Sequence, residues 1–316
     1  MASLDPEVLA TYPDSAALYR KLGAWAGVDP RGLLLTPGSD GAIRLCFETF
    51  VSEGDAVVIT APTFAMYPVY SRMFGAQVTA LEYRPSNAGP VLEAQEIIDA
   101  IAKAKPRLVC LPNPDSPTGT TFAEADLRAI IEAAGAAGAA MLVDEAYYPF
   151  CAETVVPWIA EYPHLIVART TAKAWGMAGL RIGYAVASPE VAVMLHKMRP
   201  MYECSTVAMA AFDAMLDHTA QTDASVARLE AGKAGFLAAM TALGFRVLNG
   251  KGNFLHVAFG AEAGQVHEAL QDICYYRKDF NEPCLKGFSR FSSTTVEQFQ
   301  PVIEAIQMAV KRSRNV

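Results

Sequence analysis

Between residues 15 and 200, short apolar runs alternate with stretches of helical periodicity, and this alternation constrains the fold more than any other feature. Several runs are apolar at nearly every position, as strands covered by helices on both faces should be. The expected strands are Leu33–Leu35, Ala56–Thr60, Gln77–Leu81, Arg107–Leu111, Ala140–Val143, Leu165–Ala168 and Ile182–Val186. The expected helices include Gly41–Phe50, Leu92–Lys103 and Ala123–Ala137. This order predicts an α/β fold with a mostly parallel central sheet and helices on both faces.

The pattern changes after about Cys204. A long helical stretch, Asp223–Leu243, is suited to link two domains, and short strands mix with helices beyond it. There we expect strands at Arg246–Leu248, Phe254–Phe259, Ile273–Tyr276 and Gly287–Phe291, with helices at Ala263–Gln271 and from Val296. We therefore divide the chain into an N-terminal segment (1–14), a large α/β domain (15–205) and a smaller α+β domain (206–316).

Composition excludes several classes of function. The formal net charge of −7 argues against a nucleic-acid partner, which needs a basic face. The six cysteines form no C-x-x-C pair and lie mostly in apolar runs, which predicts buried free thiols in a reducing cytoplasm. The five histidines have no ligand spacing, so we expect no metal site. No signal peptide or membrane-spanning run is present, and we expect a soluble cytoplasmic protein.

Lys173 is the first candidate for chemistry, because ligands of open α/β sheets bind outside the carboxyl ends of the strands. It follows the expected strand Leu165–Ala168 within a glycine-rich stretch that has few nearby carboxylates. Desolvation and neighbouring cations lower the pKa of a lysine in such a place, which favours an imine-forming nucleophile. Taken alone, however, a lysine after a strand is more often simply solvated.

Other segments after strands allow two interpretations each. Asp144 is either a functional carboxylate or an acidic residue at a helix start. The segment Thr36–Gly41 is either a phosphate site at a helix N-terminus or a helix capped by Ser39 or Asp40. The stretch Pro112–Gly119, taken alone, is a proline-rich turn.

Two single residues are equally open on their own. Phe64 is suited to stacking on a planar ligand or to a place in the core. Arg290 is suited to bidentate pairing with a carboxylate, or to an exposed position on a strand.

Taken together, these segments resemble the class I/II aminotransferases, which use pyridoxal 5′-phosphate and have the aspartate-aminotransferase fold. The resemblance implies that Lys173 binds the cofactor covalently and that Arg181, eight residues later, clamps its phosphate with help from Thr170. It also implies that Asp144 pairs with the pyridine nitrogen and that Tyr147 hydrogen-bonds the ring oxygen. A protonated pyridine is the electron sink that stabilises a substrate carbanion.

The same resemblance assigns further cofactor contacts within the large domain. Gly38, Ser39 and Asp40 lie where the family binds the phosphate, and Phe64 where it stacks an aromatic ring on the cofactor. Ser116 stands where the family has an asparagine, and Ala172 where it has a serine, so two usual contacts differ here. Arg290 matches the arginine that binds the anionic end of the substrate, and Arg277 is a second candidate.

The order of these motifs is most similar to the histidinol-phosphate aminotransferase group. There the tyrosine equivalent to Tyr12 reaches the cofactor phosphate of the neighbouring subunit, which implies a homodimer with composite active sites and a dimer contact in residues 1–14. The substrates implied are an amino acid or amino-alcohol phosphate resembling histidinol phosphate, and 2-oxoglutarate, in a ping-pong reaction. This chain starts at about the point where the usual N-terminal arm ends, so we expect a more open substrate end.

Two alternatives stay open at this point. The same cofactor contacts also suit a decarboxylase of a phosphorylated amino acid, because the choice of reaction depends on which Cα bond stands perpendicular to the ring. The second alternative is a non-catalytic scaffold that only binds the cofactor, since a fold alone does not prove a function.

Overall fold

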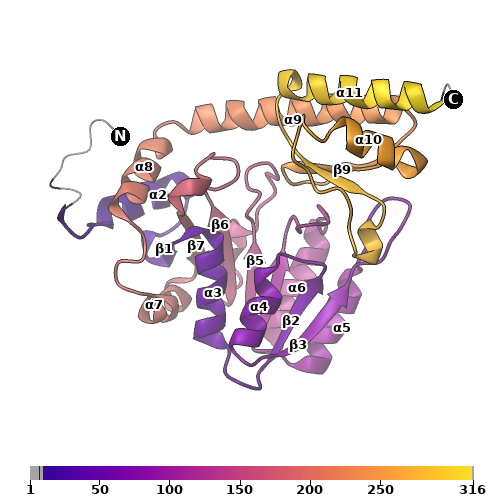
Figure 1. Cartoon of the computed structure of the whole chain (residues 1–316). Helices are drawn as coiled ribbons and strands as arrows, with labels where there is room; N and C mark the ends of the chain where they lie inside the picture. The colour runs from indigo at the N-terminus through magenta and orange to yellow at the C-terminus, as the bar shows by residue number, and fades with distance from the viewer. Residues whose placement is uncertain (1–6, 8–9, 315–316) are drawn as a thin grey trace.

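The computed structural model describes residue 7 and residues 10–314, and a seven-stranded sheet forms its centre. The strands lie in the order β1-β7-β6-β5-β4-β2-β3, and Figure 1 labels all of them except β4. Their bounds are β1 Leu33–Thr36, β2 Ala56–Ala61, β3 Gln77–Glu82, β4 Leu108–Pro112, β5 Ala140–Asp144, β6 Leu165–Thr170 and β7 Gly183–Ala187. Strands β3, β2, β4, β5 and β6 are parallel, whereas β7 is antiparallel to β6 and β1. The predicted mostly parallel sheet is confirmed.

Helices cover both faces of this sheet, as its strands predict. One face packs against α2 (Ala16–Ala26), α5 (Ala94–Ala104), α6 (Glu124–Ala136) and α8 (Thr206–Leu216). The other packs against α3 (Gly38–Phe50), α4 (Met66–Met73) and α7 (Pro189–Met198). Alternate residues of β4 enter the two cores, with Val109 on the first side and Cys110 on the second. Each such side chain contributes roughly 1.5–3 kcal/mol when it is fully buried, so a two-sided apolar strand is strongly held at the centre.

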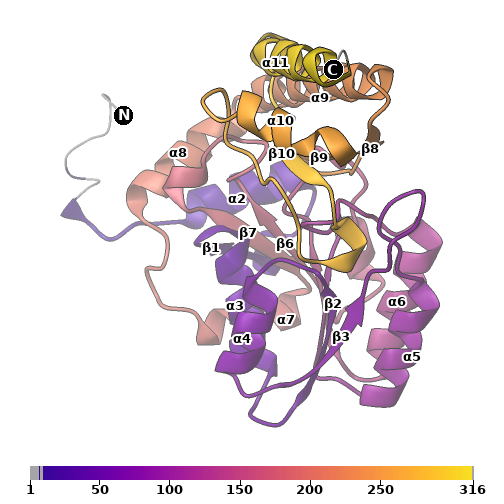
Figure 2. The ribbon, with the colours of Figure 1, turned by 45° about the vertical axis from the view of Figure 1, so that its right-hand side comes forward.

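A second, three-stranded sheet lies above the first (Figures 1 and 2). Its antiparallel strands are β8 (Arg246–Leu248), β9 (Phe254–Ala258) and β10 (Ser289–Ser292), in the order β10-β9-β8. The long helix α9 (Thr219–Ala242) runs from α8 to this sheet and packs beside α11 (Val296–Arg314), with α10 (Ala263–Ala269) next to α11. Their apolar side chains form a separate core around Phe236, Leu255 and Ile306.

The remaining regular elements are short 3-10 turns at Pro30–Gly32, Val156–Ala160, Ala178–Leu180, Gly260–Glu262 and Pro283–Leu285. No helix among the described residues is both long and apolar enough to cross a membrane. The division of the chain at residue 205 stays a prediction.

The predicted strand Ile273–Tyr276 is wrong. These residues form a turn and an irregular segment after α10, and Tyr275 is fully exposed. Only Arg277 meets β10, through a single bridge to Arg290 in which each backbone N–H donates to the other residue's carbonyl. The run of β-branched and aromatic residues suggested a strand, but a strand also needs a partner edge, and β10 offers one at a single residue.

Candidate active site

A cavity of about 370 Å³ lies at the carboxyl ends of β4, β5 and β6, below β10. Its lining residues are Ser39, Asp40, Phe64, Pro112, Pro114, Ser116, Asp144, Ala146, Tyr147, Thr170, Ala172, Lys173, Arg181 and Arg290. Parallel strands bring their carboxyl ends to the same edge, which is why side chains far apart in the sequence meet here. Most of the site residues predicted from the sequence therefore share this one cavity, and Tyr12, Gly38 and Arg277 are the ones that do not line it.

One end of the cavity is built to bind an anion. Helix α3 begins at Gly38, with Pro37 as its N-cap, so the alternative of a cap at Ser39 or Asp40 is wrong and both residues lie in the first turn. Gly38 has a φ of 75° and touches Arg181: a Cβ there would lie 2.9 Å from the Arg181 Nη2 atom and 3.7 Å from the Thr170 hydroxyl. The positive φ therefore favours glycine, and a Cβ at this position would also push the Arg181 guanidinium aside.

Arg181 adds a positive charge that has no carboxylate partner. Its guanidinium donates to the Ala178 carbonyl at 3.1 Å, and no ion pair holds it within the part of the chain that the structure describes. Its own backbone lies in the left-handed region, with a φ of 51°, which costs about 1 kcal/mol or more for a non-glycine residue. A strained, unpaired arginine beside a helix N-terminus is a natural site for a phosphate group.

Asp144 ends β5, and its buried carboxylate also lines the cavity. The chain turns after it and no helix starts there, so the alternative of a helix-start residue is wrong. Its Oδ2 atom accepts a hydrogen bond from the Tyr67 hydroxyl at 3.2 Å, and its Oδ1 accepts one from the Ala146 N–H at 3.0 Å. Burial nevertheless raises the pKa of this carboxyl from about 3.8 to about 6. A cationic N–H in the cavity would relieve that cost.

Lys173 reaches solvent through the mouth of the cavity, yet its surroundings lower its pKa. Loss of water around the ammonium group is the largest cause, and the positive charges of Arg290 and Arg181 add to it against the opposing effect of Asp144. Its Nζ atom lies 5.6 Å from the centre of the Tyr147 ring. A lysine with a lowered pKa is more often unprotonated and therefore a better nucleophile and base.

Aromatic and hydroxyl side chains form the walls. Phe64 is 37% exposed and lines the cavity, so the alternative of a core phenylalanine is wrong. Tyr147 is buried, with its ring edge-on to Phe254 at 5.4 Å. Burial raises the pKa of Tyr147, and a hydrogen bond with Ser116 opposes that rise. The two hydroxyls thus act as a pair that faces the cavity.

The two arginines proposed for the substrate lie in different surroundings. Arg290 is half-buried on β10 and lines the cavity, with its guanidinium 5.0 Å from the centre of the Phe254 ring. Arg277 is exposed; its guanidinium stacks on Phe280 at 3.8 Å and forms an ion pair with Glu282 at 3.0 Å. Arg290 is therefore available to an anionic ligand in the cavity, whereas Arg277 already has a partner.

Tyr12 lies away from the cavity of its own chain. Its ring is 76% exposed and stacks on Tyr202, with 4.1 Å between the ring centres. The two rings form a small exposed aromatic patch outside the cavity.

Two supporting contacts were not predicted from the sequence. Tyr67, on α4, donates to Asp144 as described above. Beneath the site, Arg169 and Glu145 form a buried ion pair at 2.8 Å, and Arg169 also stacks on Tyr148 at 3.6 Å. Both pairs join residues that are distant in sequence, and only the position of Tyr67 three residues after Phe64 could have drawn attention to it.

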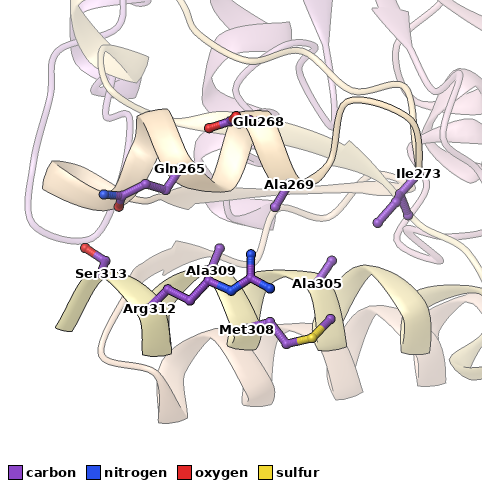
Figure 3. Close-up of a pocket in the computed structure, with 9 residues that line it drawn as sticks. All are labelled: Gln265, Glu268, Ala269, Ile273, Ala305, Met308, Ala309, Arg312 and Ser313. Atoms are coloured by element: carbon purple, nitrogen blue, oxygen red, sulfur yellow. The ribbon is translucent and has the colours of Figure 1, made fainter. Parts of the chain in front are cut away.

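Elsewhere, the described residues hold no group of three or more His, Cys, Asp or Glu side chains arranged for a metal ion. A larger, open groove of about 690 Å³ lies between α10 and α11 (Figure 3). Its walls combine Ala269, Ile273 and Met308 with Arg312, and it contains no lysine, histidine or cysteine. The chemistry is therefore concentrated in the cavity around Lys173.

Comparison with known proteins places this geometry in context. The model of the family "Aminotransferase class I and II" matches residues 4–306. A histidinol-phosphate aminotransferase from Symbiobacterium thermophilum is 33% identical over 311 residues, which cover 95% of this chain and 82% of that protein.

Two solved structures share the fold. Histidinol-phosphate aminotransferase from Sinorhizobium meliloti, in complex with pyridoxal-5′-phosphate, has a TM-score of 0.85 and 21% identity over 98% of this chain and 85% of its own. L-threonine-O-3-phosphate decarboxylase from Porphyromonas gingivalis has a TM-score of 0.79 and 22% identity over 96% of this chain and 92% of its own. At these identities the structural likeness concerns the fold alone.

Proposed function

This chain belongs to the aminotransferase class I and II family, and we propose that it transfers an amino group to 2-oxoglutarate from a substrate resembling histidinol phosphate, through Lys173. It is a pyridoxal-phosphate-dependent transaminase with an aspartate-aminotransferase-like fold, as the sequence predicted. The observation that carries the proposal is the convergence of Lys173, Asp144 and Arg181 on one cavity.

The residues present fit pyridoxal 5′-phosphate. The phosphate fits the end formed by the α3 N-terminus, Thr170 and Arg181, where Gly38 leaves space that a Cβ would fill. The buried carboxylate of Asp144 suits the protonated pyridine nitrogen, because a cation there lowers the cost of burying the negative charge. Phe64 and the Tyr147–Ser116 pair remain for the ring face and the ring oxygen.

The bound cofactor supplies an electron sink for the electrons left when the substrate loses its α-proton. The residues of the chain provide proton transfer and substrate binding. Lys173, once its amine is free, would take the proton from the substrate Cα as a base and deliver it as an acid to the C4′ carbon of the cofactor, across the substrate nitrogen. Asp144 keeps the ring nitrogen protonated throughout. Arg290 holds the anionic end of the substrate and so fixes which bond on Cα faces Lys173.

The charges in the cavity support the proposed substrate pair. Arg181 serves the phosphate of the cofactor, which leaves Arg290 as the cation for a carboxylate or phosphate of the substrate. We infer that both substrates, the amine donor and 2-oxoglutarate, use Arg290 in turn, since a ping-pong reaction binds them one after the other in the same place. The relative from S. thermophilum supports histidinol phosphate as the model for the donor.

The assembly and location are part of this proposal. The Tyr12–Tyr202 pair is exposed and so remains open to contact by a second copy, which supports the proposed homodimer in which Tyr12 completes the partner's phosphate site. Free cysteines, five of them buried, are suited to the reducing cytoplasm.

Transamination is tested with the purified protein, pyridoxal phosphate and glutamate alone. We expect a visible absorption band that glutamate changes and 2-oxoglutarate restores. Each subunit should release one 2-oxoglutarate and then stop, because no acceptor is present to complete the cycle. Carbon dioxide release from a phosphorylated amino acid, without this single turnover, would instead support the decarboxylase alternative. Failure to bind the cofactor at all would contradict the whole proposal.

Arg290→Ala is expected to lower kcat/KM for glutamate by about 10- to 100-fold, the range for losing hydrogen bonds to a charged group. Steady-state kinetics measure this, and Arg290→Lys separates charge from fork geometry, since lysine keeps only the charge. Arg277→Ala tests the second candidate; its ion pair with Glu282 leads us to expect a smaller loss. A larger loss in Arg277→Ala than in Arg290→Ala would exchange their roles.

A further inference from the structure

Lys233 is buried in the middle of α9, with only 2% of its surface exposed, and it lies outside the cavity. Its ammonium group donates to the carbonyl of Gly250 at 2.6 Å and to that of Gly252 at 2.9 Å. The third contact is to Glu230 Oε1 at 3.5 Å. Lysine is almost never fully buried unless it is paired, and here two of its partners are carbonyls of one short loop. The hydrogen bonds of Lys233 therefore link α9 to that loop, residues 249–253.

This loop, which connects β8 to β9, lies directly against the site loop 113–119 that carries Ser116. The Lys251 N–H donates to the Gly119 carbonyl at 2.9 Å. The two backbones touch: a Cβ added at Gly250 would lie 2.9 Å from the Gly119 Cα. Only glycine allows two main chains to approach so closely, so a side chain at Gly250 would push the two loops apart.

The same loop also supports Tyr147. A Cβ at Gly252 would lie 3.2 Å from Tyr147 Cδ1, so the ring packs against the loop backbone. Phe254, two residues later, places its ring edge-on to Tyr147 at 5.4 Å. The loop 249–253 thus contacts α9, the Ser116 loop and the Tyr147 ring. The Lys233 ammonium group donates hydrogen bonds to two carbonyls of this loop.

We propose that Lys233 is a positioning residue, which fixes the loop 249–253 and through it the orientation of Tyr147 and Ser116 at the ring oxygen of the cofactor. The inference rests on the proposed function, because it assumes that these two hydroxyls face the cofactor. It predicts that Lys233 affects the bound cofactor without touching it.

The alternative is that Lys233 contributes only to folding stability. A well-packed apolar side chain can replace a buried charge at little cost, so stability alone does not explain a lysine here. The two roles are separated by comparing Lys233→Met with Leu237→Ala. Leu237 lies one helical turn further along α9 and is buried in the core of the small sheet. Among the described residues it forms no hydrogen bond to the loop 249–253.

The experiment titrates the full-length, cofactor-stripped variants with pyridoxal phosphate and follows the visible absorption of the bound cofactor against pH. Tyr147, as a donor to the ring oxygen, favours the ionised form of that oxygen. A displaced Tyr147 therefore moves the pH midpoint of the absorption change upward. We expect Lys233→Met to raise the midpoint and to raise the Kd of the cofactor about five- to tenfold, the effect of one lost hydrogen bond.

Gly250→Ala should give the same upward shift while keeping Lys233, because its Cβ forces the two loops apart. Leu237→Ala and Lys251→Met, an exposed lysine of the same loop, should keep the wild-type midpoint even where thermal stability falls. The inference is overturned if Lys233→Met and Gly250→Ala shift the midpoint no more than Leu237→Ala does. If the wild-type protein gives no visible band with pyridoxal phosphate, the proposed function itself fails.

Discussion

Lys173→Ala is expected to lower the rate of amino transfer by about 10⁴-fold, the upper range for the loss of a general acid–base group. Lys173 is the one lysine that lines the cavity among the residues that the structure describes, and its surroundings lower its pKa. No other lining residue carries an amine, so neither the covalent attachment nor the proton transfer has a substitute. Single-turnover kinetics with glutamate measure the chemical step directly.

A small primary amine provides the control for this result. If the loss comes from the missing base, added methylamine should restore part of the rate, because it fills the space that the side chain leaves. The free energy of unfolding should not fall by more than about 0.5 kcal/mol, because Lys173 forms no ion pair in the described chain and its ammonium group is already partly desolvated. A variant that keeps a tenth or more of the wild-type rate would assign the base to another residue.

The fold of this protein was predictable because its periodic signals are strong. Strands such as β4 are apolar at every position and bury both faces, which distinguishes them from amphipathic strands. The segment Ile273–Tyr276 has the same residue types but no partner edge beyond Arg277, and a partner edge is a property of the tertiary structure. Helix α3 begins three residues before the predicted Gly41, because Pro37 takes the cap position that Ser39 or Asp40 was expected to fill.

Only the site residues that belong to recognisable sequence motifs could be predicted. Asp144 ends β5, and Lys173 and Arg181 lie in the segment between β6 and β7 of the same sheet, so their convergence was expected from the order of the strands and from the resemblance. The hydrogen bond from Tyr67 to Asp144 joins residues 77 positions apart and depends on how α4 packs on the sheet. The contact of Lys233 with Gly250 and Gly252 depends on how a loop folds back on a helix. Contacts of this kind leave no period or motif in the sequence.

Asp144→Asn is expected to change stability and activity in opposite directions. Burial raises the pKa of Asp144 from 3.8 to about 6, so the cofactor-free folded state binds more protons than the unfolded state between these values. Stability rises with pH only where the unfolded state binds more protons, so this carboxyl lowers stability as the pH rises through about 4 to 6. At about 1.36 kcal/mol for each tenfold change in the proton equilibrium, the difference between the two pKa values gives an upper limit of about 3 kcal/mol near neutral pH.

Asparagine removes this cost, because it has a similar shape and no charge to bury. The cofactor-free variant should therefore unfold several degrees above the wild type at about pH 8, and the difference should vanish below about pH 3, where both states of the wild type are protonated. Thermal unfolding across pH measures it, with Asp272→Asn, an exposed carboxyl, as the control for charge alone. An equal gain at every pH would show that the carboxyl titrates normally and that its burial has no electrostatic cost.

Activity should fall by about 10²- to 10³-fold in the same variant, the range for removing one preorganised electrostatic contact in an active site. Asparagine cannot hold a positive charge on the ring nitrogen, so the cofactor loses its capacity as an electron sink. Tyr67→Phe separates the two effects, because it removes the hydrogen bond to Oδ2 while keeping the carboxylate. Its loss of activity should be much smaller than that of Asp144→Asn. If both variants lose the same activity, the orientation of the carboxylate by Tyr67 matters more for catalysis than its negative charge.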